Sequence, residues 1–228
     1  TNSNHRYHKW KNLIHGFEPM AANQLWVADI TYIMLNNGDV CYLHLITDAY
    51  SRMIVGWELA DTLRASITIK ALEQAISQTG GVSLEDLTHH SDRGVQYCCD
   101  DYVRMLQTHK IKISMTEDYN PTDNAIAERA NGVIKTETVY SRKTFNSLEH
   151  ARNVIGRFIH FYNYRRPHMS IGYKIPAVVH TETGAQKKMW KKKNYPKKAY
   201  NNGNNGISLP CRTTGADDGC NHHTVYSI

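Results

Sequence analysis

One stretch of the chain, LWVADITYIML at residues 25–35, limits the possible folds more than any other. Alternate residues of a strand point to opposite faces, and here both faces are mostly apolar, which is typical of a central strand covered on both sides. Asp29 stands in the middle of this stretch. A carboxylate is costly to bury there unless it is paired, hydrogen-bonded or bound to a cation, so a structural role and a site role both stay open.

The rest of the chain supplies the neighbours that a central strand needs. Periodicity and turn residues predict strands at 25–35, 40–47, 50–60, 87–92 and 112–116, and helices at 65–79, 101–110, 123–140 and 147–166. Asn37-Gly38 marks a tight turn between the first two strands. Strands followed by alternating helices and strands favour the α/β class, with a mixed five-stranded sheet flanked by helices.

The composition is that of a folded chain without a membrane segment. Of 228 residues, 41% are hydrophobic and 21% are charged, which is enough to bury a core. No apolar run approaches the roughly 18 to 20 residues that span a bilayer, and the first residues lack an apolar signal core, so we expect a cytoplasmic protein. The five cysteines show no repeated CxxC spacing, which favours reduced thiols over disulfides or a zinc site.

The net charge of +6 is unevenly distributed. Residues 1–180 hold 19 basic and 18 acidic residues, whereas residues 181–228 hold 8 basic and 3 acidic. We therefore expect a basic N-terminal linker at 1–22, a folded core at 23–180 and a Lys-rich, then low-complexity and disordered tail at 181–228. Lysines interleaved with aromatic residues suit nucleic-acid contact, but a solvated segment fits this tail equally well.

Two further acidic residues fall where sheet proteins place chemistry. Asp92 ends the predicted fourth strand, and Glu128 lies on the helix predicted at 123–140. Helical spacing groups Glu128 with Asn124, Asn131 and Lys135 on one face, opposite an apolar face that can pack on the sheet. That apolar face consists of Ile126, Ala130, Val133 and Ile134.

Three converging carboxylates repel one another unless divalent cations share them, and hard oxygen ligands favour Mg²⁺ or Mn²⁺. A pair of such ions can activate a water or a 3′-hydroxyl for phosphoryl transfer without a protein nucleophile. The chain has no GxSxG, HExxH, P-loop or GxGxxG motif, which agrees with that chemistry.

Together these segments resemble the catalytic core of the DDE integrases and transposases. The resemblance is specifically to transposases that bacterial insertion sequences produce by frameshifting between two reading frames. The spacing is specific, because 35 residues separate Asp92 from Glu128 and Lys135 follows seven positions later. The matching segments are Trp26 to Ile33, Thr47 to Gly56, His90 to Tyr97, Asp123 to Glu128 with Lys135 and Glu137, and Tyr162 to His168.

The resemblance implies an RNase H-like fold in which Asp29, Asp92 and Glu128 hold Mg²⁺, or Mn²⁺ as a substitute, and cleave and join DNA. It further implies a homo-oligomer of at least two copies on DNA, in a cytoplasmic, nucleoid-associated setting. The residues implied as DNA contacts or neighbours of the site are Lys135, Asn124, Gln96 and Arg93.

Other residues of these segments are given supporting roles. Arg166 and His168 are expected to be structural, His90 to support Asp92 rather than ligate, and Asp48 to stand outside the triad. Two alternatives stay open: a nuclease of the same fold that cuts without joining, and a non-catalytic DNA-binding or assembly protein with a decayed site. The family's upstream DNA-binding region is not recognised in residues 1–22, so we expect weak sequence-specific end binding.

Overall fold

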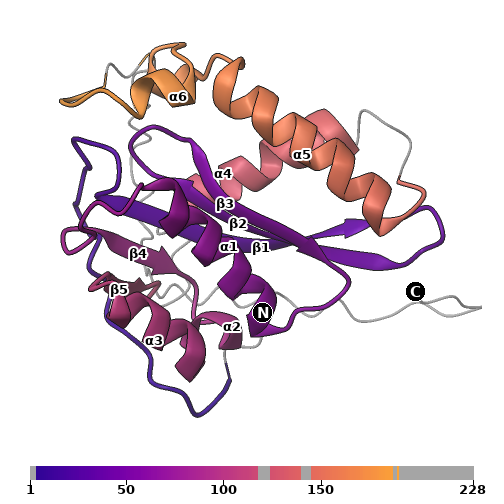
Figure 1. The fold of residues 1–228 in the computed structure, drawn as a ribbon, viewed down its shortest axis with the longest axis horizontal. Coiled ribbons are helices and arrows are strands. Elements are labelled where there is room, and N and C mark those ends of the chain that lie inside the picture. The colour runs from indigo at the N-terminus through magenta and orange to yellow at the C-terminus, as the bar shows by residue number, and fades with distance from the viewer. Residues whose placement is uncertain (1–3, 118–123, 140–144, 187–188, 190–228) are drawn as a thin grey trace, which may run out of the picture. The chain divides into compact units, whose positions relative to one another are not determined.

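Five strands form one mixed sheet in the order β3-β2-β1-β4-β5 (Figure 1). The computed structural model describes residues 4–117, 124–139, 145–186 and 189. The strands are β1 Leu25–Met34, β2 Val40–Asp48, β3 Ile54–Ala60, β4 Thr88–Ser91 and β5 Lys112–Met115. The first three strands pair antiparallel, whereas β4 runs parallel to β1 and β5 parallel to β4. The predicted mixed five-stranded sheet is confirmed, with β1 at its centre.

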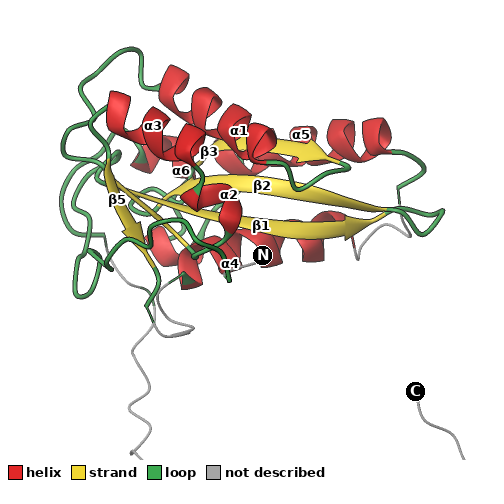
Figure 2. Cartoon of the chain, turned by 90° about the horizontal axis from the view of Figure 1, so that it is seen from below, coloured by secondary structure: helices red, strands yellow, loops and turns green. Residues whose placement is uncertain are grey.

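Helices cover both faces of the sheet, and Figure 2 shows α1 and α4 on opposite sides of β1 and β2. The helices are α1 Ala65–Gln78, α2 Val95–Cys98, α3 Asp100–Thr108, α4 Ala125–Ile134, α5 Leu148–Tyr164 and α6 Pro176–Val179, with a π-helix η1 at Lys135–Val139 and a 3₁₀-helix η2 at Met169–Ile171. The four longest lie where the sequence predicts helices.

The alternating residues of β1 divide the core into two layers. Trp26 and Ala28 pack with α1 and α3, whereas Leu25 and Val27 pack with Ala127 of α4. Asp29 belongs to the second series, because it is odd-numbered like Leu25 and Val27. The face of the sheet that α4 covers is therefore the face that carries Asp29.

Close packing of α1 on the sheet depends on a glycine in β3. A Cβ atom added to Gly56 would lie 2.1 Å from the carbonyl oxygen of Ala71 on α1. Only a residue without a side chain allows this approach. The tight turn predicted between β1 and β2 is also present, with Gly38 at φ +87° and its amide donating to the Leu35 carbonyl over 3.1 Å.

The structure differs from the sequence-based elements in two places near the site. The third strand begins at Ile54 rather than at residue 50, because the chain turns back at Asp48, whose carbonyl accepts from the Arg52 amide over 2.9 Å. Arg52 takes a left-handed conformation in this turn, with φ 68°. The helix predicted at 123–140 ends as an α-helix at Ile134 and continues as the π-helix η1, a form that occurs frequently at functional sites.

Segments outside the sheet are held against it. The amide of Leu13 donates to the Ser114 hydroxyl over 2.8 Å, and Met115 donates to the Lys11 carbonyl over 3.3 Å. Ala21 forms a β-bridge with Thr183. Residues 187–188 and 190–228, which make up most of the predicted tail, lie outside the described residues. Within the described part of the chain, no helix has the length and apolarity that a membrane crossing requires.

Candidate active site

Asp29 lies midway along β1 and faces α4. Its two carboxylate oxygens accept different donors: Oδ1 accepts from the Ile30 amide over 2.9 Å, and Oδ2 accepts from Nδ2 of Asn131 over 2.7 Å. The second bond joins the central strand directly to α4. The carboxylate is therefore oriented by the helix that also carries Glu128.

Asp92 is placed beside Asp29 by the strand register. In the parallel pair of β1 and β4, Val27 lies opposite His90, so two residues further along, Asp92 follows the end of β4 next to Asp29. The carboxyl ends of parallel strands share one edge of a sheet, where side chains of different strands meet. Oδ1 of Asp92 accepts from the Gly94 amide over 2.9 Å, which fixes the loop after the strand.

Glu128 comes from α4, which two asparagines anchor across β1. Nδ2 of Asn124 donates to the Ala28 carbonyl over 3.2 Å, and Asn131 makes the bond to Asp29. Glu128 itself is exposed. The polar face predicted for this helix is therefore split: Asn124 and Asn131 are buried against the sheet, and Glu128 stands on the accessible side.

The apolar residues of α4 are divided as well. The helix buries Ala127, Ala130 and Ile134, whereas Ile126 and Val133 are only half-buried. The predicted packing face is therefore correct for Ala130 and Ile134 but lies rotated toward Ala127. The rotation follows from the two asparagine bonds to β1, which turn the polar side of the helix partly inward.

The three predicted carboxylates influence one another electrostatically. The pKa of Asp29 is raised from 3.8 to about 6, chiefly by burial and also by the neighbouring charges of Asp92 and Glu128, whereas the bonds from Asn131 and Ile30 oppose the rise. Like charges near a desolvated carboxylate disfavour its ionised form. The structure thus brings Asp29, Asp92 and Glu128 into one electrostatic environment.

The donor set suits a hard divalent cation, although it is not assembled into a compact cage. Within the described residues, no three Asp, Glu, His or Cys side chains gather closely enough to form a metal cluster. The available donors are nevertheless all oxygens, which Mg²⁺ prefers. Besides the carboxylates they include the buried Oδ1 atoms of Asn124 and Asn131, which accept no hydrogen bond from the described residues. A cation would neutralise the repulsion that raises the pKa of Asp29.

Lys135 is the first residue of η1, which continues directly from α4. Its Nζ lies 4.2 Å from the ring centroid of Tyr32, which is 59% exposed on β1. Burial lowers the pKa of Lys135, and the negative charge of Asp29 counteracts this. The Thr138 hydroxyl donates to the Ile134 carbonyl over 2.6 Å and so satisfies a backbone acceptor at the change from α- to π-helix.

The remaining predicted neighbours of the site lie deeper. Gln96 is 4% exposed, and its Nε2 donates to the Leu63 carbonyl over 3.0 Å. Arg93 is half-buried, and its carbonyl bonds with Nε2 of His5 over 2.9 Å. His90 is buried, with Nδ1 at 2.8 Å from the Ser114 hydroxyl on β5. Of the four implied DNA contacts, the structure leaves Lys135 and Arg93 partly accessible and buries Asn124 and Gln96.

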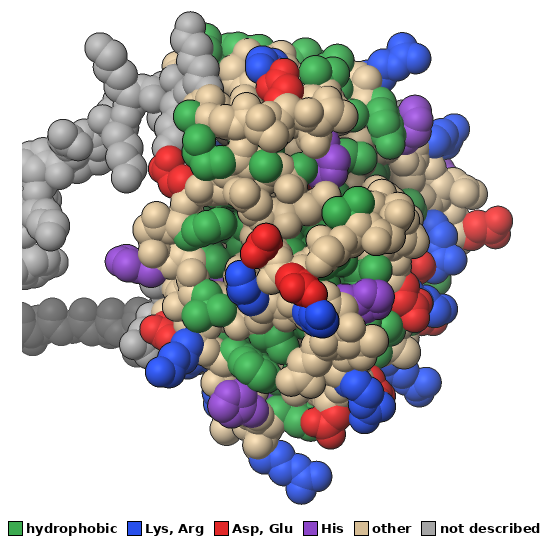
Figure 3. Space-filling view, turned by 60° about the vertical axis from the view of Figure 1, so that its left-hand side comes forward, with side chains coloured by type: hydrophobic (Ala, Val, Ile, Leu, Met, Phe, Trp, Pro, Cys, Tyr) green, Lys and Arg blue, Asp and Glu red, His purple; other side chains and the backbone are tan. Residues whose placement is uncertain are grey.

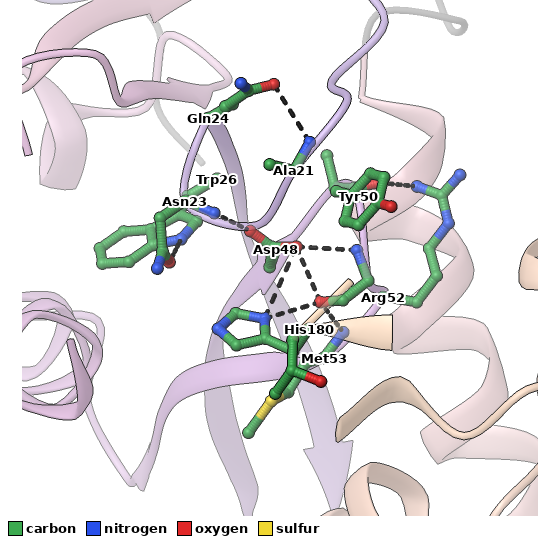
Figure 4. Close-up of polar contacts among 12 residues, drawn as sticks. Ala21, Asn23, Gln24, Trp26, Asp48, Tyr50, Arg52, Met53 and His180 are labelled. Carbon is green, nitrogen blue, oxygen red and sulfur yellow. Dashed lines mark hydrogen bonds and ion pairs between the residues drawn. The ribbon is translucent and has the colours of Figure 1, made fainter. Parts of the chain in front are cut away.

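Asp48, on the neighbouring strand, has a different environment (Figure 4). It is fully buried, and its carboxylate accepts from the Asn23 amide at 2.8 Å and from the amide and hydroxyl of Ser51 at 2.8 and 2.7 Å. Nδ1 of His180 lies 3.9 Å away. These donors make Asp48 the centre of a turn that ties β2 to the segment after α6.

Arg166 and His168 bond to groups other than the three predicted carboxylates. The guanidinium of Arg166 forms hydrogen bonds of 2.5 to 3.2 Å with both carboxylate oxygens of Glu137. Its Cζ lies 5.7 Å from the ring centroid of Tyr162 on α5. Nδ1 of His168 lies 2.8 Å from the Ser170 hydroxyl. Arg166 thus links the end of α5 to η1, and His168 links the residues after α5 to one another.

Charges on the surface are mixed. On the face drawn in Figure 3, acidic, basic and hydrophobic side chains are interspersed. This agrees with the near balance of 19 basic and 18 acidic residues in positions 1–180. Local charge around the carboxylates therefore matters more for a ligand than the net charge of the chain.

Asn131 is a site residue that the sequence pattern does not single out. It bonds directly to Asp29, whereas helical periodicity places it only on a polar face. The signal was its position three residues after Glu128, which puts both side chains over the same end of the sheet.

Comparison with known proteins agrees with this geometry. Two models of the integrase core domain match the chain, one over residues 19–121 and the other over residues 109–176. The putative transposase for insertion sequence element IS986/IS6110 of Mycobacterium tuberculosis (strain ATCC 25618 / H37Rv) is 37% identical over 174 residues, which are 75% of this chain and 62% of that protein. The uncharacterized 31 kDa protein of insertion element IS600 from Shigella sonnei is 38% identical over 179 residues, 78% of this chain and 64% of that protein. The chain thus spans less than two thirds of these relatives.

Solved structures give the same fold. A chain of the simian T-cell lymphotropic virus intasome in complex with PP2A regulatory subunit B56 gamma superimposes with a TM-score of 0.62 at 20% identity, covering 83% of this chain and 65% of that one. The HTLV-2 integrase catalytic core domain in complex with magnesium gives a TM-score of 0.56 at 20% identity, covering 72% of this chain and 99% of that one. The fold is RNase H-like, as predicted, and the chain belongs to the integrase core family together with the transposases of bacterial insertion sequences.

Proposed function

We propose that this chain is the catalytic part of a transposase, which cleaves DNA at the ends of a mobile element and joins the freed 3′-hydroxyls to target DNA. One observation carries the proposal: Asp29, Asp92 and Glu128 come from β1, the end of β4 and α4, and the two other carboxylates raise the pKa of Asp29. A protein tolerates such repulsion at a site that binds cations. The family membership supports the same activity.

The polar neighbours orient the carboxylates. Asn131 and the Ile30 amide hold the two oxygens of Asp29, and the Gly94 amide holds Asp92. Glu128, which is exposed on α4, is the third carboxylate of the set. When bound to these residues, divalent cations of the Mg²⁺ type supply activation of a water or 3′-hydroxyl and neutralise the leaving oxygen. Cleavage and joining are then the same displacement with different nucleophiles.

Residues around the carboxylates contribute to DNA binding. Lys135 and Arg93 are partly accessible and are assigned to the phosphate backbone, since cationic side chains supply most of the affinity for DNA. Asn124 and Gln96 are buried, so we assign them to positioning the helix and the loop after β4 rather than to direct contact. His90 links β4 to β5 through its contact with the Ser114 hydroxyl.

The wider organisation follows from the activity. In this proposal residues 23–180 form the catalytic core, residues 1–22 a basic linker segment, and residues 181–228 a Lys-rich, then low-complexity tail. Bringing two DNA ends together requires at least two copies of the chain. HTLV-2 integrase core structures are described in dimeric and trimeric forms, which supports oligomerisation as part of the proposal.

The decisive experiment replaces one carboxylate. We expect Asp92→Asn to lower end joining in Mg²⁺ or Mn²⁺ by about a thousandfold or more, as removal of a central catalytic group does elsewhere. The control is Asp86→Asn, which removes the same charge from a fully exposed position 3.8 Å from Lys112. Circular dichroism and thermal melting should show that both variants are folded. Normal joining by Asp92→Asn would disprove the assignment.

The same assay separates the two alternatives. A DNA duplex labelled at the 5′ end of the strand whose 3′ end is cleaved yields a longer labelled product if the chain joins strands, and only a shortened labelled product if the chain is a nuclease that cuts without joining. A non-catalytic DNA-binding protein yields neither product. The assay is done with the 228-residue chain and with a version extended by the upstream region of a relative.

A further inference from the structure

A pocket of about 620 Å³ opens beside α4. It lies between α4 and the segment from the end of α5 to Tyr173, and the fold brings these parts together although they are far apart in the sequence. The lining is cationic, with Arg52, Arg129 and Arg166, and contains no acidic side chain among the described residues. Its volume is in the range of small-molecule and cofactor sites.

Arg52 forms the inner, cationic end of the pocket. The burial of its guanidinium lowers its pKa, and its nitrogens donate to the Ser170 hydroxyl and the Ala49 carbonyl. No carboxylate of the described residues lies within ion-pair distance of it. Arg52 is half-buried, and the charge of Asp48 offsets only part of the cost of desolvating its guanidinium. Its backbone takes a left-handed φ of 68° at a non-glycine residue.

Arg129 is the second arginine of the pocket lining. It projects from α4, directly after Glu128, is exposed, and makes no hydrogen bond or ion pair with the described residues. Arg166, in contrast, is neutralised by its fork to Glu137. Two of the three arginines therefore have guanidinium capacity available for an anion, and an arginine fork matches phosphate oxygens in particular.

The other wall of the pocket is apolar and aromatic. Ile126 and Val133 of α4 face Tyr162 across the pocket, and Met169 and Tyr173 lie at its mouth. Tyr173 is 57% exposed and Met169 is 45% exposed. A pocket with a cationic end and an aromatic wall matches a ligand that is anionic at one end and flat and apolar at the other.

The pocket is continuous with the surface that carries the catalytic glutamate. An adjoining hollow of about 510 Å³ is lined by Glu128 and shares Arg129, Val133 and Arg166 with the pocket. A nucleic-acid strand that has one phosphate at the carboxylates can therefore place a neighbouring nucleotide in the pocket.

We infer that this pocket receives an unpaired nucleotide of the DNA strand that is cut or joined, with its phosphate at Arg52 and Arg129 and its base against Tyr173 and the apolar wall of α4. The inference rests on the proposed function. An unpaired nucleotide fits better than duplex DNA, because a duplex offers phosphates but keeps the faces of its bases stacked inside. Base–aromatic stacking tolerates any sequence, which suits a site that acts at many targets.

The experiment measures binding rather than catalysis, so that its outcome does not depend on strand transfer. A fluorescently labelled four-nucleotide thymidine strand is titrated with the full chain carrying Asp92→Asn, without divalent cations, and anisotropy is recorded. Arg129→Ala and Tyr173→Leu should each weaken binding by about tenfold, the range expected for a lost phosphate contact or a lost stacked base. Tyr173→Phe retains the ring and should bind like the parent.

The control is Arg104→Ala on α3, where Arg104 is exposed and pairs only with Asp101 at 3.4 Å. For Arg129→Ala the dependence of log affinity on log salt should fall by about 0.7, the value for one phosphate on a single strand. Arg52→Lys, checked by thermal melting, tests the inner end, because an ammonium cannot form the same fork.

Three results would overturn the inference: unchanged binding in both Arg129→Ala and Tyr173→Leu, an equal loss for a blunt duplex of the same charge, or full competition by an oligoglutamate peptide. The last result would assign the pocket to an acidic protein segment. If Asp92→Asn retained strand transfer while the pocket variants lost the oligonucleotide, the assignment of Asp92 as a catalytic residue would fail and the pocket would stand. If Asp92→Asn lost strand transfer while the pocket variants bound the oligonucleotide like the parent, the catalytic assignment would stand and the pocket inference would fail.

Discussion

Asp29 and Asp48 lie on neighbouring antiparallel strands, and both carboxylates are desolvated by the same sheet. Asp48 accepts hydrogen bonds from the Asn23 amide and from the amide and hydroxyl of Ser51, and Nδ1 of His180 lies 3.9 Å away. Asp29 receives two donors and has two carboxylates as neighbours, and its pKa rises to about 6. The difference lies in the neighbours rather than in the strand positions.

The contrast separates a carboxylate that stabilises the fold from one that costs stability. Every accessible oxygen of a buried structural carboxylate is satisfied by N–H or O–H donors, since an unsatisfied charge in the core is expensive. A carboxylate that binds a cation must leave part of its charge uncompensated until the cation arrives. Asp48 follows the first pattern and Asp29 the second, and substitutions at the two positions should therefore act in opposite directions.

The largest effect is expected at Asp48. Replacement by Ala leaves the Asn23 and Ser51 amides buried without an acceptor, and loss of a buried charged partner costs about 3 to 5 kcal/mol. We expect Asp48→Ala to lower the free energy of unfolding by this amount in urea denaturation. Asp86→Ala, at an exposed carboxylate, should leave it nearly unchanged. A loss below about 1 kcal/mol at Asp48 would remove the structural side of the comparison.

At Asp29 the sign reverses and depends on pH. Because its folded pKa of about 6 is above the value of 3.8, protonation favours the folded state below pH 3.8, and this contribution is lost as the pH rises through about 6. Asp29→Asn removes that dependence. The variant should therefore gain stability relative to the parent as the pH rises: the difference in the free energy of unfolding, variant minus parent, should be about 2 kcal/mol larger at pH 8 than at pH 4, allowing for partial exposure. A flat difference across this range would contradict the raised pKa.

The sequence predicted much of this comparison. Apolar residues on both faces of 25–35 located the central strand, and its single carboxylate identified Asp29 as unusual before any partner was known. Asp92 and Glu128 were located by strand end and helical face, together with a spacing typical of the family. These features are local in sequence or depend on simple periodicity, which explains why they could be predicted.

Features set by tertiary contacts could not be predicted in the same way. Helical periodicity placed Asn131 on a polar face, but only the approach of α4 to β1 determines that its amide reaches Asp29. The late start of β3 follows from the turn at Asp48, whose neighbours include residues far apart in the sequence, such as Asn23 and His180. The π-helix after Ile134 depends on the spacing of backbone hydrogen bonds, which the pattern of polar and apolar side chains does not predict.

A divalent cation should affect the two carboxylates differently. Binding at ten times the dissociation constant stabilises the folded state by about 1.4 kcal/mol, which raises the melting temperature by about 3 to 6 °C for a chain of this size. We expect this shift in Mg²⁺ for the parent and for Asp48→Asn, and its reversal by EDTA. Asp29→Asn should show little shift. An equal shift in Asp29→Asn would place the cation elsewhere on the chain.

The smallest effect concerns the helix that approaches Asp29 and leaves Asp48 untouched. Gly132 of α4 is exposed, and a Cβ atom added there would meet no atom within 4 Å. Gly132→Ala should therefore raise the free energy of unfolding by about 0.5 to 1 kcal/mol through helix propensity alone. Amide exchange should slow on α4 and remain unchanged around Asp48. Gly56→Ala is the matched opposite, since its Cβ would lie 2.1 Å from the Ala71 carbonyl oxygen, and this variant should be less stable. If Gly132→Ala also lost stability, α4 would require an unusual backbone at this position to bring Asn131 and Glu128 to the site.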